Sequence, residues 1–387
     1  MTLERRDASQ VVTKPVPGAP GGPRWLGALG HVTGLKYSYS LPGGCDQMSC
    51  TVQIPAYYRT DALNPGRIVQ VWRGSSCVWD GKLDEPQPGD KGWTVTAHGS
   101  GTFGADFAAI YTTWNADDCI NQAITRGLRW NNPGIGSGPG IWLSQQQDSG
   151  SQTITDHLNL ITLGATGQTS PNYIGMTWYV YPAGGNNTLR VFQLPTAVNR
   201  QLVCTTPVPR TIAADINTLW LRYQSAPDLP ATKTTPAVPA KFAVASATIP
   251  ASVTTHGPME AYQDITSGGT LTLAQAQNVG NGILSHYQRA NFAGPFNAGP
   301  RQLLTCGGYP VDLGCEQAGT VVQLLATDDA FGGEVVSGPV TFLVGAYEFD
   351  DDSYTATVTP YQSARHDLST LISDMYPRGR YGYHKRK

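Results

Sequence analysis

Basic and aromatic side chains alternate at the C-terminal end of the chain. The alternating residues are Arg378, Arg380, Tyr381, Tyr383, Lys385, Arg386 and Lys387. Such a segment could contact phosphates through its cations and stack nucleobases on its tyrosines. A solvated terminus is the simpler interpretation, and docking onto an acidic partner is a third. We therefore take these residues as candidate partner contacts within a basic tail, 378–387.

Acidic residues cluster at three further places, but their spacing does not favour a catalytic centre. Asp350–Asp352 lies between two strand patterns and is typical of a solvated turn. Asp84 and Glu85 are adjacent in a predicted strand, so their carboxylates would point to opposite faces. His366 and Asp367 begin a predicted helix, where an acidic residue favours the helix dipole. Because the common catalytic and phosphate-binding motifs are also missing from the sequence, we expect no catalytic residues and no enzyme.

The cysteines are scattered, and none forms a CxxC pair. They are Cys45, Cys50, Cys77, Cys119, Cys204, Cys306 and Cys315. Zinc and redox sites need tighter, paired spacing, so we expect no metal and no cofactor. Buried free thiols are the main interpretation, although Cys45 with Cys50, or Cys306 with Cys315, could close a small loop if oxidised.

The composition indicates many short strands joined by turns. Glycine (44) and proline (28) make up close to a fifth of the 387 residues, and only 14% of residues are charged, against about a quarter in an average soluble protein. The formal net charge of −2 gives no general attraction to nucleic acid or anionic membrane. No run of 18 apolar residues is present, so we expect no membrane segment. The first 24 residues hold several prolines and glycines, and we expect a flexible arm without regular pairing.

Alternating patterns predict strands in two groups, separated by helical patterns. The strands of the two groups are predicted at 35–41, 50–57, 67–74, 77–85 and 92–100, and at 301–308, 319–328, 338–349 and 353–361. Helices are predicted at 115–130, at 152–163 with Ser151 as cap, at 270–290 and at 366–376. Thr272 and Gln275 form a T-x-x-Q capping box for the third helix. A hairpin is predicted around the turn 184–187, and another strand at 212–223.

A weak internal repeat relates the two strand groups. Gly66–Val71 resembles Gly319–Leu324, and similar segments follow both in the same order. The fold class is therefore predicted as β-rich α+β and multi-domain, with two similar small β-barrel modules and an α+β insertion domain. The predicted map is an arm (1–24), a first β-barrel module (25–112 with 205–225), the insertion domain (113–204), a linker loop and helix-containing domain (226–290), a second β-barrel module (291–377) and the basic tail (378–387).

The order of these segments resembles that of tailed-phage baseplate hub proteins. Pro65–Gly99 is similar to their first barrel, the capped helix and tryptophan strand at 151–181 to their insertion domain, and 341–376 to their closing strands and C-terminal helix. In its general character the sequence resembles minor tail proteins of phages that infect actinobacteria. The resemblance implies a homotrimer in the virion tail tip, assembled in the host cytoplasm, that closes or continues the tail tube. Its implied partners are the distal tail ring, the tape measure and tip or fibre proteins, with unspecific contact to passing DNA.

Two alternatives stay open. A distal tail protein, which forms a hexameric ring, belongs to the same group of assembly proteins. A carbohydrate-binding or cell-wall-degrading tail protein would be a different class, supported by nine tryptophans and eighteen tyrosines. Most of these aromatic residues alternate within strand patterns, which favours core packing. Many hub relatives extend into a wall-degrading or receptor-binding module, and because this chain ends at Lys387 we expect no such module.

Overall fold

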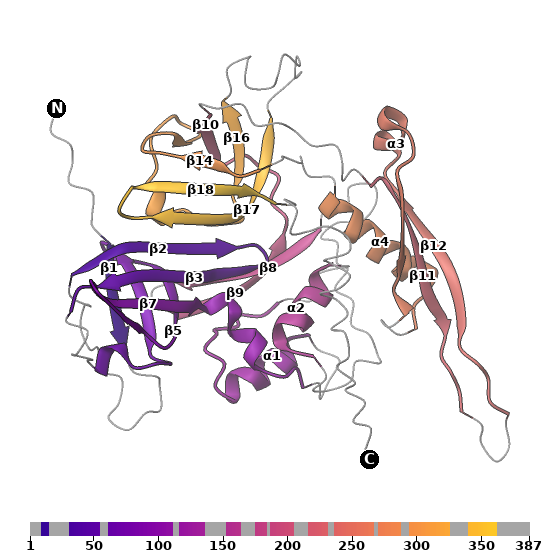
Figure 1. Ribbon diagram of the computed structural model, residues 1–387. Helices are drawn as coiled ribbons and strands as arrows, with labels where there is room; N and C mark the ends of the chain where they lie inside the picture. The colour runs from indigo at the N-terminus through magenta and orange to yellow at the C-terminus, as the bar shows by residue number, and fades with distance from the viewer. Residues whose placement is uncertain are drawn as a thin grey trace.

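Strands dominate the structure, a computed structural model, and they form two separate sheets (Figure 1). The residues that the structure describes are 9–14, 31–54, 61–110, 116–135, 152–163, 175–183, 186–204, 216–230, 236–266, 270–287, 294–325 and 340–361. One sheet has fifteen strands and the other has three. The β-rich α+β class expected from the sequence is confirmed, with more than one sheet.

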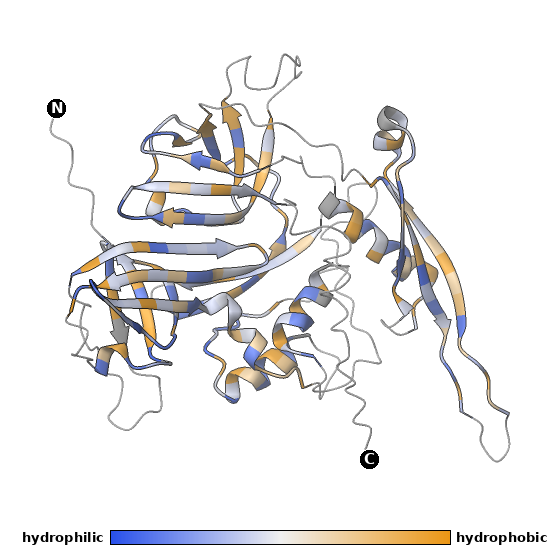
Figure 2. Ribbon diagram, in the orientation of Figure 1, coloured by the Kyte–Doolittle hydropathy of each residue, from blue (hydrophilic) through white to orange (hydrophobic). Residues whose placement is uncertain are grey.

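The first half of the large sheet forms one β-module in the strand order β1-β4-β5-β7-β3-β2. Its strands are β1 (Ser9–Lys14), β2 (Val32–Ser40), β3 (Gly43–Val52), β4 (Ile68–Arg73), β5 (Ser76–Leu83), the short β6 (Gln87–Gly89) and β7 (Gly92–Gly99). Buried and exposed residues alternate along β7, and the same two-residue period appears as alternating colours in Figure 2. The alternation that predicted these strands therefore describes one packed and one open face.

The second half forms a similar module in the order β15-β10-β16-β17-β18-β14. Its strands are β10 (Arg200–Val203), β14 (Phe296–Ala298), β15 (Leu303–Thr305), β16 (Val321–Leu325), β17 (Thr341–Asp350) and β18 (Thr355–Pro360). β10 comes from the end of the predicted insertion domain and pairs with β15 and β16. The predicted boundary at 204 is therefore wrong for this strand.

The two modules repeat one pairing order. β4, β5 and β7 pair as an antiparallel meander, and so do β16, β17 and β18, while β3 and β14 extend the two meanders at equivalent ends. The outer neighbours differ in direction, because β1 is antiparallel to β4 whereas β10 is parallel to β16. Among the described residues the pairings run along an open path, and no closed barrel is found for either of the two β-barrel modules expected from the sequence.

The modules join edge to edge through β2 and β17, which makes their sheets continuous. On the packed face Tyr37 lies opposite Phe349, and Tyr39 lies opposite Tyr347. Neighbouring rings of this group lie 5.4 to 6.5 Å apart, within the range in which cross-strand aromatic pairs stabilise a sheet. All four side chains are buried, so one hydrophobic core runs through both modules.

The insertion domain packs two helices against a hairpin beside the first module. The helices are α1 (Ala116–Thr125) and α2 (Ile154–Leu163), and the hairpin is β8 (Met176–Ala183) with β9 (Asn186–Gln193). Ile120, Leu158 and Trp178 are fully buried in their shared core. The cap of α2 is a box made by Thr153 and Asp156, whose backbone N–H groups are each bound by the other's side chain. The expected cap Ser151 lies outside the described residues.

The small sheet is an independent unit in the order β12-β11-β13. It holds β11 (Thr218–Ala226), β12 (Lys241–Thr248) and β13 (Glu260–Asp264), with α3 (Pro250–His256) between the last two and α4 (Leu273–Tyr287) on one face. Leu219 and Leu221 of β11 and Val279 and Ile283 of α4 form its core. The predicted return of a strand in 205–225 to the first module is wrong, because β11 pairs with β12 and β13 instead.

Two segments predicted to be irregular, the N-terminal arm and the linker loop, contain β-strand pairing. Ser9–Lys14 of the predicted flexible arm pairs with β4, because this stretch precedes the first proline and alternates without glycine. The predicted linker loop is partly an extension of the β11–β12 hairpin, since Leu229 and Val238 exchange both backbone hydrogen bonds at 2.9 Å. Among the described residues no helix is long and apolar enough to cross a membrane.

Candidate assembly surface at the junction of the modules

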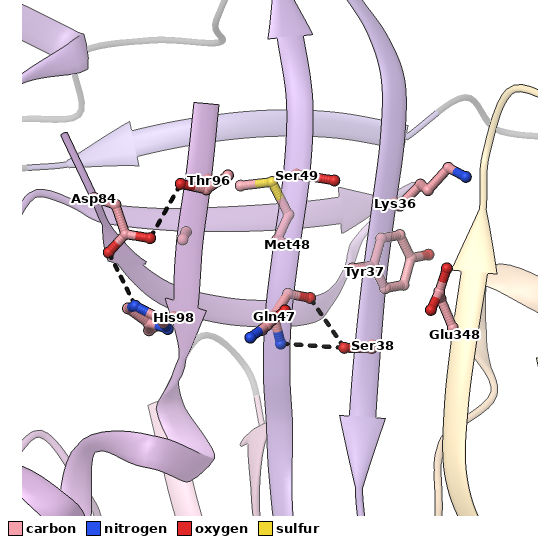
Figure 3. A pocket seen from close by; sticks show the side chains of 11 residues that line it. Lys36, Tyr37, Ser38, Gln47, Met48, Ser49, Asp84, Thr96, His98 and Glu348 are labelled. Atoms are coloured by element: carbon pink, nitrogen blue, oxygen red, sulfur yellow. Dashed lines mark hydrogen bonds and ion pairs between the residues drawn. The ribbon is translucent and has the colours of Figure 1, made fainter. Parts of the chain in front are cut away.

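A shallow polar groove crosses the open face of the large sheet at the junction (Figure 3). It has a volume of about 390 Å³ and draws its lining from β2, β3, β7 and β17 and from Asp84, which follows β5. The lining residues are Lys36, Tyr37, Ser38, Gln47, Met48, Ser49, Asp84, Thr96, Ala97, His98 and Glu348. The groove therefore spans both modules and depends on the β2–β17 pairing.

Strand register places the polar side chains of the groove side by side. Ser38 lies opposite Glu348, and Lys36 lies opposite Asp350. The Lys36 ammonium is 3.2 Å from an oxygen of Asp350. Because the aromatic residues of the same strands occupy the packed face, the alternation of β2 and β17 leaves mainly polar groups on this side at the seam, with the methyl group of Ala346 as the apolar member.

Asp84 is held at the edge of the groove by two neighbours on β7. The Thr96 hydroxyl donates to one oxygen of Asp84 at 3.1 Å, and His98 Nε2 lies 3.3 Å from the other (Figure 3). His98 is more than half exposed, so this pair is an open surface interaction. Within the described part of the chain, no three His, Cys, Asp or Glu side chains group as metal ligands. The groove is therefore suited to polar surface contact.

A buried guanidinium fastens the two modules beneath the sheet. Arg73 of β4 is only 2% exposed, and its Nε and Nη2 lie 3.1 Å from the two oxygens of Asp312. Its Nη1 donates to Asp351 at 2.8 Å and to Ser9 of β1 at 2.6 Å. Burial favours the neutral form of Asp312, but hydrogen bonds from Tyr354 and Arg73 outweigh it and lower the pKa of Asp312. Because two nitrogens of Arg73 face two oxygens of Asp312, the contact fixes the relative orientation of the two side chains in addition to pairing their charges.

The insertion domain is fastened to the first module by a second buried carboxylate. Asp80 of β5 is fully buried and accepts hydrogen bonds from Gln70 and, at 2.8 Å, from Asn187 of β9. Arg129, which follows α1, places Nη2 3.5 Å from Asp80. Burial lowers the pKa of Arg129, while Asp80 opposes that change. A buried charge of this kind persists only with several partners, and here the partners come from both units.

Some of the candidate residues named from the sequence lie outside the described residues, and others have partners in the structure. The basic residues Arg378, Arg380, Tyr381, Tyr383, Lys385, Arg386 and Lys387 lie outside the described residues, as do His366 and Asp367. Asp350 ends β17 and the next two acidic residues lie in the turn that follows, and Asp350 and Asp351 are held by Lys36 and Arg73. No local pattern in the sequence indicates the roles of Arg73 and Asp80, because Asp312 and Asn187 lie far from them in the chain.

All seven cysteines are free thiols. Cys45, Cys50, Cys77 and Cys119 are buried, as expected, whereas Cys306 and Cys315 are exposed. The two small disulfide loops considered from the sequence are not formed. Burial raises the pKa of Cys45 and of Cys50 to about 12 in each case.

Solved structures of phage tail proteins share this fold. A tail protein from Neisseria meningitidis MC58 matches with a TM-score of 0.54 and 11% identity, covering 94% of this chain and 99% of its own. The 43 kDa tail protein of prophage MuSo2 from Shewanella oneidensis matches with a TM-score of 0.53 and 14% identity, and the match covers 91% of this chain and 98% of that protein. The prophage tail protein gp18 from Listeria monocytogenes EGD-e matches with a TM-score of 0.52 and 10% identity, and the match covers 95% of this chain and 99% of that protein. No family model and no curated protein sequence matches the chain.

Proposed function

We propose that this chain, which has the fold of phage tail proteins over nearly its whole length, is a structural virion protein of a tail tip. Within that role we propose the baseplate hub, a homotrimer that closes or continues the tail tube. The role proposed is non-enzymatic. It would place the chain in contact with the distal tail ring, the tape measure and tip or fibre proteins.

One observation carries the hub assignment: two modules with the same meander order are joined edge to edge in a single chain. Tail tubes are sixfold, and three chains with two modules each would present six similar units to the ring above. A hexamer would present twelve and would mismatch. The edges of the joined sheet also need partners, because unpaired strand edges invite association, and a closed ring supplies them.

The joined sheet also offers a suitable inner surface. Its open face at the seam carries serine, threonine and glutamine with charges of both signs, a surface that would let DNA pass without strong binding. In this arrangement the insertion domain with α1 and α2 would lie outside the ring.

Rotational symmetry tests the proposal. Native mass spectrometry of the purified chain and symmetry-free electron microscopy of particles should both give three copies. Six copies in a ring would favour the distal tail protein instead. A chain that is monomeric in intact particles, or that releases sugars from purified cell walls, would contradict the hub.

A further inference from the structure

The small sheet exposes an aromatic face on the side opposite α4. Trp220 of β11 is 40% exposed, Tyr262 of β13 is 56% exposed and Val244 of β12 is 57% exposed, so nothing in the described part of the chain covers this face. The sheet stands at the margin of the molecule (Figure 1), and β12 is hydrophobic along most of its length (Figure 2). Exposed patches of this composition mark interaction sites.

Register brings these side chains together. Trp220 lies directly opposite Tyr262 on one side, and in the next outward-facing row Arg222 lies opposite Val244 and Asp264. The other face of β11 is closed, because Leu219 and Leu221 are fully buried against α4. Both faces of the small sheet therefore carry large apolar side chains, but α4 covers one face and the other is exposed to solvent in the described part of the chain.

Two charged groups of the aromatic face, Arg222 and Asp264, are paired with each other. Arg222 Nη1 lies 3.2 Å from Asp264, and its guanidinium carbon lies 4.7 Å from the centre of the Phe242 ring. Arg222 and Asp264 therefore compensate each other, and the exposed carboxylate of Glu260 at the start of β13 is the remaining charge on this face, so the face suits neither a strongly anionic nor a strongly cationic partner. The ion pair also occupies the polar side chains of Arg222 and Asp264, which would otherwise be available to bind sugar hydroxyls.

The size of the face sets what can cover it. Three strands about 4.8 Å apart that rise about 3.3 Å per residue give on the order of 400 Å², whereas a specific interface covers about 800 Å² per partner. The apolar strip continues along the hairpin through Leu229 and Val238, which are both exposed. In the part of the chain that the structure describes, no strand pairs with the outer edge of β12, and Lys241 is the only charged residue of that strand. Together these elements make a contact of sufficient extent.

We infer that the face formed by Trp220, Phe242, Val244 and Tyr262 docks onto a second copy of this chain. The inference rests on the proposed trimer and assigns the surface that holds it. A face with one uncompensated charge, Glu260, gives little repulsion of another copy of a chain in which 14% of residues are charged, and tryptophan, tyrosine and arginine are the residues that dominate protein interfaces. In a ring, the projecting sheet of each copy would cover part of the next.

The test combines Val244→Arg with Tyr262→Arg in the full chain. Both side chains point to solvent in the single chain, so the thermal unfolding midpoint of the dissociated variant should stay close to that of the dissociated wild type. By native mass spectrometry and sedimentation, we expect a trimer for the wild type and a monomer for the variant, with at least a hundredfold weaker association. Tyr309→Arg is the matched control, because Tyr309 is 74% exposed in a turn of the second module, and it should remain trimeric.

A benzophenone side chain placed at position 262 gives a second readout that does not depend on breaking the contact. Irradiation should join it to a peptide of another copy, identified by mass spectrometry. A double variant that stays trimeric, with cross-links only within one chain, overturns the inference and leaves the trimer standing. A wild type that is monomeric overturns the inference and the proposed trimer together, and binding of wall polysaccharide that quenches Trp220 fluorescence would assign the face to sugar instead.

Discussion

Arg73 and Asp312, 239 positions apart in the sequence, form a two-pronged ion pair with both N–O distances at 3.1 Å. The pair joins β4 of the first module to the turn before β16 of the second. The hydroxyls of Tyr37 and Tyr347 donate to the carbonyl oxygens of Gly314 and Leu313, next to Asp312 in that turn. The contact therefore fixes the turn against the seam where β2 meets β17.

Arg73→Ala should destabilise the chain by about 3 kcal/mol, because removing one partner leaves charged groups without compensation in a partly buried site. Urea unfolding followed by fluorescence would measure the loss. Lys36→Ala is the matched control, since the Lys36–Asp350 pair is largely exposed and should contribute less than about 1 kcal/mol. Equal losses in the two variants would contradict the assigned role of Arg73.

Asp312 should make stability depend on pH in the acid range. The folded-state pKa of Asp312 is held below the ordinary value of an aspartate by hydrogen bonds from Tyr354 and Arg73, which outweigh burial, so the unfolded chain binds the proton more readily. Its contribution is fully present above the unfolded pKa and is lost as pH falls through the folded pKa. The difference in unfolding free energy between wild type and Asp312→Asn should be constant above about pH 5 and shrink below about pH 4. A difference that grows on acidification would refute this reasoning.

Gly44→Ala should strongly destabilise the contact between the first module and the insertion hairpin. Gly44 has a φ of +101°, and a Cβ there would lie 2.1 Å from the carbonyl oxygen of Val180. We expect a loss of about 2 kcal/mol or more. Gly66→Ala is the control, since Gly66 also has a positive φ but nothing lies within 4 Å of its Cβ position; its loss should be about 1 kcal/mol. Similar melting temperatures for the two variants would argue against the close β3–β8 approach.

Thiol labelling should divide the cysteines by exposure. In the native chain at pH 8, Cys306 and Cys315 should react with a thiol reagent, and Cys306 faster, because partial burial raises the pKa of Cys315 to about 11. Cys45, Cys50, Cys77 and Cys119 should react only after unfolding, when all seven label. Rapid native labelling of Cys50 would show that β3 is not packed as described. Elemental analysis of the same sample should find no stoichiometric zinc or iron.

Deletion after Pro377 should leave the fold intact and weaken contact with a tip partner. The deletion removes the basic tail, Arg378–Lys387, which carries all seven candidate contact residues. Thermal unfolding of the truncated chain should match the full chain. If the tail instead bound DNA, affinity would fall steeply with added salt, because each phosphate contact releases counterions. Loss of soluble protein on deletion would show that the tail is part of the fold.

Local signals allowed several elements to be predicted from the sequence. The Thr272–Gln275 box starts α4 as expected, with the Thr272 N–H donating to the Gln275 side chain at 2.8 Å. Ala276, Val279 and Ile283 form its buried stripe, and β8 and β9 pair as an antiparallel hairpin as expected, with Asn186 and Asn187 of the predicted turn already in β9. Each of these depends on residues close in the chain, so propensity, period and capping were enough.

The partners of strands and charges were decided only by the tertiary structure. The sequence 212–223 indicated a strand, but nothing in its alternation distinguished the first module from β12 and β13 as its neighbours. The same holds for Arg73 with Asp312 and for Asp80 with Asn187, which come from different units. Alternation fixes which residues face the core, because successive side chains point to opposite sides of a strand. It carries no information on which edge pairs with which, since backbone hydrogen bonds are the same for every strand, and long-range packing makes that choice.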